Sequence, residues 1–196
     1  MSISLVKGQK ISLDKESDDQ LSRIVVACGW DEAKSVGSRL GSMFGVSSGE
    51  SIDLDLSALV FDENKQLLET VYFGKLSGTG IKHSGDNLTG AGSGDDETIT
   101  ISLNDVSTKT KSIVFTINSF RGQSFNSIDK AFCRVYNPLA RNKEYARYDL
   151  SAKGEHTAMI MSRLYKHGSE WKFEAIGEMG MGRVAADLVS LAKTTF

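Results

Sequence analysis

The 196-residue sequence contains a single proline, Pro138, and only two cysteines, Cys28 and Cys133. The cysteines lie in apolar runs and form no Cys-x-x-Cys pair, so we expect buried thiols in a reducing compartment. No stretch approaches the roughly 18 apolar residues of a membrane span, and residues 1–8 lack the pattern of a secretory signal. We therefore expect a cytoplasmic protein that does not insert directly into a membrane.

Basic residues are also scarce in parts of the chain. The formal net charge is −2, which gives no overall attraction to nucleic acid or to an anionic membrane. Residues 40–64 and 83–108 contain no Lys or Arg and five acids each, whereas residues 109–172 hold twelve bases against five acids. Those bases are scattered and belong to no recognisable nucleic-acid-binding module, so we expect no nucleic acid partner.

Helical periodicity is missing between residues 52 and 180. Short alternating or apolar runs instead predict strands, the clearest being residues 98–103, with a hairpin formed by residues 52–61 and 67–73. Residues 32–50 and the glycine-rich residues 74–97 are predicted to lack regular structure. Further strands are predicted at 2–6, 11–13, 21–27, 112–118, 130–136, 144–150, 157–166 and 170–176. About ten short strands and one helix near residues 184–191 predict a β-sandwich or barrel in one domain.

Residues 83–97 combine four acidic side chains with many glycines and contain no Lys or Arg. The possible ligands in this stretch are Asp86, Asn87, Asp95, Asp96 and Glu97. These side chains offer oxygen, which suits a hard cation such as calcium, and glycines let a backbone turn tightly around an ion. A solvated acidic loop is the alternative. His83 is interpreted as a turn or surface residue, with a supporting role beside an ion as the alternative.

The segment 86–97 has the length of an EF-hand loop, with Asp first and Glu last. However, Leu88 and Gly90 occupy its third and fifth positions, and Ala91 stands at the sixth, where an EF-hand requires glycine. No helices are predicted on either side. The pattern therefore excludes an EF-hand, and a calcium site here would combine several loops on a β scaffold.

A second acidic pattern lies within residues 52–61. On a strand, Asp53, Asp55 and Ser57 share one face and alternate with apolar residues on the other. Two carboxylates about 7 Å apart on one face repel each other unless a cation lies beside them.

The same residues resemble the Asp-x-Asp signature of magnesium-dependent phosphatases, with Asp53 as nucleophile and Asp55 as acid and base. That fold needs alternating strands and helices, which the sequence does not predict. A phosphate-binding Gly-x4-Gly-Lys-Ser/Thr motif is also missing. A metal-dependent phosphohydrolase remains an alternative function.

Eight short motifs follow one another along the chain. They are residues 2–8 (SISLVKG), 29–31 (GWD), 53–59 (DLDLSAL), 85–97 (GDNLTGAGSGDDE), 113–115 (IVF), 146–150 (ARYDL), 157–160 (TAMI) and 170–173 (EWKF). In this order they resemble the TerD family of tellurium-resistance and stress-response proteins. The resemblance covers nearly the whole chain, and the GDNLTG…GDDE element is specific.

The resemblance implies an all-β, two-sheet antiparallel β-sandwich that spans residues 1–196 and binds calcium at loops near one edge. It also implies a bacterial cytoplasmic protein encoded with other tellurite-resistance, phage-response or stress-response genes, and no catalytic activity is established for the family. Carried over residue by residue, the metal ligands fall on Asp31, Asp53, Asp55, Asp86, Asn87, Asp95, Asp96 and Glu97.

The sequence departs from the family pattern in two places. The Gly/Ser-rich loop between Asp31 and Asp53 is longer than in the typical member, which we interpret as the mark of a paralogue with a different partner. Val106-Ser107 stands where Val-Pro is usual, which we interpret as a turn variant.

Three acidic segments that meet at one sheet edge would repel one another without cations. Calcium accepts six to eight oxygen ligands in loose geometry, so we expect Ca2+, in two sites, rather than magnesium. The leading hypothesis is a non-enzymatic calcium-binding module whose loops 31–50 and 74–97 become rigid and bind protein partners of the same resistance system, such as a membrane component. The alternatives are the phosphohydrolase and a purely structural interaction sandwich.

Overall fold

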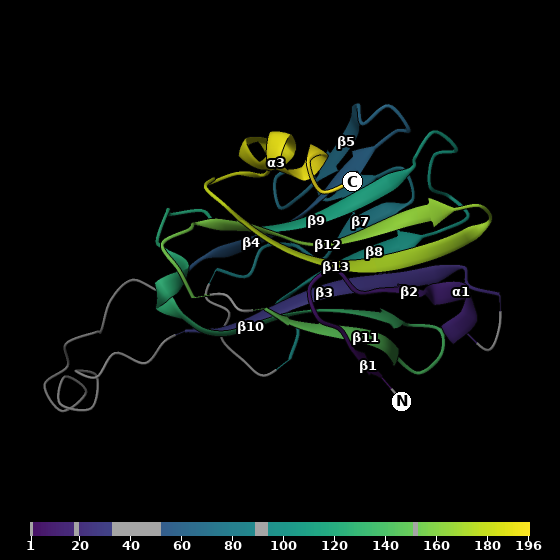
Figure 1. The fold of residues 1–196 in the computed structure, drawn as a ribbon, viewed down its shortest axis with the longest axis horizontal. Coiled ribbons are helices and arrows are strands. Elements are labelled where there is room, and N and C mark those ends of the chain that lie inside the picture. Colours follow the sequence, from purple (N-terminus) through teal and green to yellow (C-terminus); the bar gives the residue numbers. More distant parts are fainter. Residues whose placement is uncertain (1, 18–19, 33–51, 89–93, 151–152) are drawn as a thin grey trace, which may run out of the picture.

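Two β-sheets pack face to face around a shared apolar core (Figure 1). The structure is a computed structural model that describes residues 2–17, 20–32, 52–88, 94–150 and 153–196. Most of the loop predicted for 32–50, and residues 89–93 of the glycine-rich stretch, lie outside the described residues.

The strands divide between a seven-stranded sheet A and a six-stranded sheet B. Sheet A contains, in spatial order, β1 (Ile3–Ser4), β11 (Lys143–Leu150), β10 (Ile128–Asn137), β3 (Arg23–Glu32), β8 (Glu97–Ser102), β7 (Ile81–His83) and β6 (Ser77–Gly78). Sheet B contains β2 (Lys10–Ser12), β13 (Glu170–Gly180), β12 (Ala158–His167), β9 (Ser112–Ser119), β4 (Leu54–Phe61) and β5 (Leu67–Val71).

The helices are short. Within the described residues they are α1 (Leu13–Glu16), the 3-10 helices η2 (Phe125–Ser127) and η3 (Ala185–Leu188), and α3 (Val189–Lys193). The predicted C-terminal helix is thus a 3-10 turn continued by α3. The all-β, two-sheet prediction is confirmed, and the described strand pairs are antiparallel except for β1, which runs parallel to β11.

Two local predictions were wrong. Residues 74–97 contain β6 and β7, which extend sheet A beyond β8, because Ile81 and His83 pair with the alternating residues of β8. The strand predicted at 21–27 was too short, because β3 continues to Glu32 where β10 pairs with Trp30 and Asp31. A long partner strand supplies the backbone bonds that local turn residues alone do not predict.

The two faces of β4 have different surroundings, which explains its mixed pattern. Leu54, Leu56 and neighbouring even-numbered residues pack into the core between the sheets. On the outer face, Leu59 and Phe61 pack against a second apolar cluster built by η3 and α3. Figure 1 shows α3 lying over sheet B. The outer face of β4 is therefore apolar where the C-terminal helices cover it and polar toward its start, at Asp53 and Asp55.

Candidate metal centre

Three carboxylates lie together at the start of β4. One oxygen from each of Asp53, Asp55 and Asp86, which we call the acidic triad, lies within 4.8 Å of the other two. Asp53 and Asp55 are 4% and 3% exposed, whereas Asp86 is exposed. The structure thus brings together the strand acids and the first acid of the glycine-rich stretch.

The triad is tied to the ends of two other strands of sheet B. Asn118 pairs with Asp55 across β9 and β4, and its Nδ2 donates to Asp55 Oδ2 at 3.0 Å and to the Arg183 carbonyl at 2.8 Å. The Phe120 N–H donates to the Asp53 carbonyl at 3.1 Å. These bonds fix the triad beside the turn after β9 and the segment after β13.

Side chains from sheet A close the free edge of β4 beside the triad. Strand β5 pairs only with residues 58–61 of β4, so within the described part of the chain no strand pairs with this edge at Leu56. The Leu56 N–H donates to Glu97 Oε2 at 2.8 Å, and His83 Nε2 lies 2.9 Å from the Leu56 carbonyl. His83 Nδ1 accepts from the Gly85 N–H at 3.0 Å, so Nε2 carries the proton and donates. His83 and Glu97 thus replace a missing strand.

Glu97 also positions the loop that carries Asp86. Its Oε1 accepts the Asn87 N–H at 3.0 Å, so one buried carboxylate joins β4 to that loop. Gly85 has a φ of 111°, a conformation that favours glycine, and it turns the chain after β7. The Glu97 side chain therefore holds Asp86 near the two acids of β4.

Burial and mutual repulsion make the triad reluctant to ionise. Burial, followed by the negative charges of Glu97, Asp53 and Asp86, raises the pKa of Asp55 to about 7. Burial and Asp86 raise the pKa of Asp53, while Arg121 acts in the opposite direction. Burial and Glu97 likewise raise the pKa of Asp86. A bound cation would remove this penalty.

One oxygen of the triad lacks a partner among the described residues. Asp53 Oδ1 is buried and has no hydrogen-bond donor among the described residues. Arg121 Nε lies 4.0 Å from the other oxygen, Oδ2, on a side chain that is 40% exposed. A buried carboxylate oxygen without a donor is costly, and a cation would satisfy it. The all-oxygen donor set of Asp53, Asp55 and Asp86 fits a hard cation such as calcium.

The structure directs the predicted ligands Asp95, Asp96 and Asn87 toward protein partners. Asp95 accepts two hydrogen bonds from Arg134, from Nε at 2.7 Å and from Nη2 at 2.8 Å. Asp96 Oδ2 accepts the Trp30 N–H at 2.8 Å, and its Oδ1 accepts Nδ2 of Asn87 at 3.2 Å. These acids therefore tie the end of the glycine-rich stretch to sheet A.

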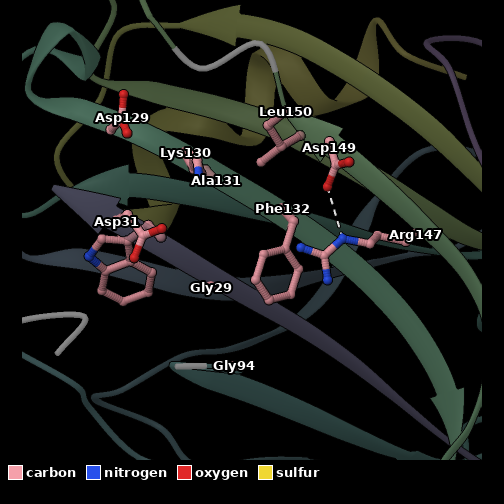
Figure 2. A pocket seen from close by; sticks show the side chains of 11 residues that line it. Gly29, Asp31, Gly94, Asp129, Lys130, Ala131, Phe132, Arg147, Asp149 and Leu150 are labelled. Carbon is pink, nitrogen blue, oxygen red and sulfur yellow. Dashed lines mark hydrogen bonds and ion pairs between the residues drawn. The ribbon is translucent and has the colours of Figure 1, made fainter. Parts of the chain in front are cut away.

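The remaining predicted ligand, Asp31, is exposed on β3 and lies outside the acidic triad. Figure 2 shows it at a cavity of about 530 Å³, on which Asp129 and Asp149 also border. Arg147 stacks over the Phe132 ring at 3.7 Å and donates to Asp149 at 2.9 Å. The acids of this cavity do not meet in a cluster of the kind that the triad forms.

Gly29 allows the glycine-rich stretch to return against β3. A Cβ at this position would collide with the Gly94 carbonyl oxygen and with the Phe132 ring. Gly94 itself borders the same cavity (Figure 2). Glycine is needed at position 29 because the backbone at Gly94 packs directly against it.

Sequence reasoning missed several residues of the site. His83, interpreted as a turn or surface residue, is buried on β7. Asn118, Arg121 and Arg134 were not singled out, because they lie on strands or turns far from the acids in sequence. The burial of His83 could have been predicted from its position two residues after Ile81. In a strand, residues two apart lie on the same face, so His83 points inward with Ile81.

Comparison with known proteins identifies the family. The sequence profile of the TerD domain matches residues 1–194. The chain belongs to the TerD family. It is 43% identical to tellurium resistance protein TerZ of Serratia marcescens, over 96% of this chain and 95% of that protein. It is 38% identical to stress response protein SCP2 of Bacillus subtilis, over 97% and 98% of the two chains.

Solved structures share the fold of this TerD-family chain. A homologue of telluride resistance protein (TerD), SCO6318 from Streptomyces coelicolor A3(2), superposes with a TM-score of 0.66 at 18% identity, covering 86% of this chain and 95% of the other. Among the described residues, no helix is long and apolar enough to cross a membrane.

Proposed function

We propose that this TerD-family protein is a non-enzymatic calcium-binding module of the tellurium-resistance and stress-response system. The proposal is carried by the acidic triad, and above all by the buried, unpartnered Oδ1 of Asp53. Asp53, Asp55 and Asp86 would hold the ion. Calcium supplies the positive charge that offsets the repulsion among these carboxylates.

Calcium suits this site better than magnesium. The triad offers carboxylate oxygens from the start of β4 and from the loop after β7, and one member is open to solvent, so water or a partner's oxygen can complete six to eight contacts. Magnesium keeps most of its own waters and binds fewer protein oxygens. The triad supports one ion. The second ion remains a prediction for acids outside the triad, such as Asp31.

The bound ion would cross-link elements of the two sheets. Asp55 lies on β4 of sheet B and Asp53 directly precedes that strand, whereas Asp86 lies on the connection between β7 and β8 of sheet A. An ion held by all three would resist separation of that connection from β4. This would give partners a calcium-dependent surface at this end of the sandwich.

Isothermal titration calorimetry with Ca2+ tests the proposal. We expect heat of binding, and a rise in melting temperature of about 5 to 10 °C when Ca2+ is in about hundredfold excess over its Kd. Asp53→Asn should lose both effects. Asp105→Asn, the same change at an exposed acid in the turn after β8, should keep them. If the unmodified protein gives no heat of binding and no thermal shift, the proposal is contradicted.

The phosphohydrolase alternative finds little support in the fold. Asp53 and Asp55 lie in an antiparallel sandwich, not at the end of a parallel sheet between helices. Magnesium-dependent turnover of a generic phosphate ester that disappears in Asp53→Asn would favour the enzyme instead.

A further inference from the structure

Three exposed apolar side chains lie on connections next to the acidic triad. Leu88, Phe120 and Met181, which we call the apolar rim, are 55%, 42% and 68% exposed. Each lies on a different connection, after β7, β9 and β13. Exposed side chains of this size gathered at one site indicate an interaction surface more strongly than isolated ones.

Sequence neighbours and hydrogen bonds place each rim residue beside the triad. Leu88 follows Asp86 by two positions, and the Phe120 N–H donates to the Asp53 carbonyl at 3.1 Å. Met181 lies two residues before Arg183, whose carbonyl accepts the same Asn118 amide that binds Asp55. The three apolar side chains therefore share one end of the sandwich with the candidate ion.

Two arginines lie within the same surface. Arg121 approaches Asp53 at 4.0 Å, and the exposed Arg183 donates through Nε to the Phe120 carbonyl at 3.0 Å. Three carboxylates outweigh these two guanidinium groups when no ion is bound. The Glu97 carboxylate also acts on the triad, although its oxygens accept two backbone N–H groups. One Ca2+ would offset the excess negative charge, so that this surface no longer repels anions.

We propose that the calcium-loaded triad and the apolar rim together bind the surface of an anionic phospholipid membrane. This inference rests on the proposed calcium binding. A calcium ion that the protein only partly surrounds takes further oxygens from lipid phosphate or serine carboxylate groups. Guanidinium groups pair with phosphates, and apolar side chains at turns enter the boundary between headgroups and acyl chains.

The shape of the surface favours a membrane over a peptide as the partner. The rim residues come from three separate turns, and none of them lines the cavity of Figure 2. A bound peptide needs a groove or a free sheet edge, and His83 and Glu97 already occupy the edge of β4 at Leu56. The Phe120 ring packs edge-on against Phe73 at 5.7 Å and is still partly exposed. Exposed apolar side chains on three neighbouring turns instead match a broad, deformable lipid surface.

Vesicle sedimentation tests the inference. The full-length protein is mixed with vesicles of phosphatidylcholine containing about one third phosphatidylserine, in saturating Ca2+ or in excess EGTA, and with pure phosphatidylcholine vesicles. We expect sedimentation only with phosphatidylserine and Ca2+ together. Leu88→Asp and Met181→Asp should each weaken it by about fivefold or more, with unchanged calcium heats.

Leu139→Asp is the matched control, because Leu139 is 63% exposed on the turn between β10 and β11. That turn lies at the end of the sandwich opposite the triad. Glu32 accepts the Ile52 N–H beside the triad and pairs with the start of β10. The other end of β10, which leads into the turn, pairs with Val25. This variant should bind vesicles like the unmodified protein.

Three results would overturn the inference. If the protein gives heat of binding with Ca2+ but does not bind vesicles, the membrane inference is overturned and the proposed function stands. That result would favour a protein partner. Binding that persists in EGTA would show that the ion does not bridge to lipid. Equal loss in Leu139→Asp and the rim variants would remove the role of the rim. Absence of calcium heats would instead contradict the proposed function itself.

Discussion

Two groups of acids meet at one end of the sandwich and differ in what satisfies them. Asp95, Asp96 and Glu97 accept hydrogen bonds from Arg134, from backbone N–H groups and from Asn87. The acidic triad has one close amide donor, Asn118, one distant guanidinium, and a buried oxygen with no donor among the described residues. The density of acids along a sequence therefore does not show which carboxylates need an external cation.

Alternation along the strand explains part of this difference. Asp95, Asp96 and Glu97 are consecutive, so their side chains diverge as β8 begins, and each reaches a different neighbour. Asp53 and Asp55 are separated by one residue and share a face. A consecutive run disperses charge, whereas an alternating pair concentrates it.

The largest effect should come from an acid of the satisfied group. Each carboxylate oxygen of Glu97 accepts one backbone N–H. Glu97→Gln replaces one of these oxygens by an NH2 group, which cannot accept. We therefore expect a loss of about 2 to 4 kcal/mol in the free energy of unfolding, measured with urea in EGTA. Asp86→Asn, a change in the exposed triad member, should cost less than about 0.5 kcal/mol. Similar losses in the two variants would erase the distinction between the groups.

The second effect concerns pH and the triad. The pKa of Asp55 is raised to about 7, so the folded state binds this proton more tightly than the unfolded chain. The carboxyl then contributes stability that is present below about pH 4 and is lost as pH rises through about 7.

Asp55→Asn should therefore raise the melting temperature in EGTA above pH 7. Allowing for solvent screening, we expect a gain of about 1 to 2 kcal/mol, or about 3 to 8 °C. The two melting curves should converge toward pH 4. Saturating Ca2+ at pH 8 should reverse the order, because only the unmodified protein binds the ion. A pH-independent difference would argue against repulsion within the triad.

The smallest effect should come from Asp95→Asn. Breaking its partly exposed pairing with Arg134 should cost about 1 kcal/mol, and a double-mutant cycle with Arg134→Gln would isolate the interaction. Calcium affinity should change by less than about threefold. A loss of affinity comparable to that of Asp53→Asn would place Asp95 among the ligands and break the comparison.

Much of the fold followed from local pattern. Alternation predicted β8, the hairpin of β4 and β5, and the shared face of Asp53 and Asp55. The family resemblance supplied the two-sheet arrangement. Pairing between distant strands set the rest, including the extension of β3 and the parallel contact of β1 with β11.

The site was harder to predict because its partners are distant in sequence. Arg134 lies 39 residues after Asp95, and Asn118 lies 63 residues after Asp55. Their meeting depends on strand order and register, which composition does not encode. The oxygen-rich stretch was visible in the sequence, but the division of its acids between structural bonds and a cation was not.

The side chains that close β4 have a consequence for the behaviour of many copies of the protein. A strand with open N–H and C=O groups can recruit a strand from another molecule and start ordered aggregation. At Leu56, Glu97 and His83 occupy both backbone groups on that side. The contacts that orient the loop carrying Asp86 therefore also protect the protein from self-association through strand addition at this edge.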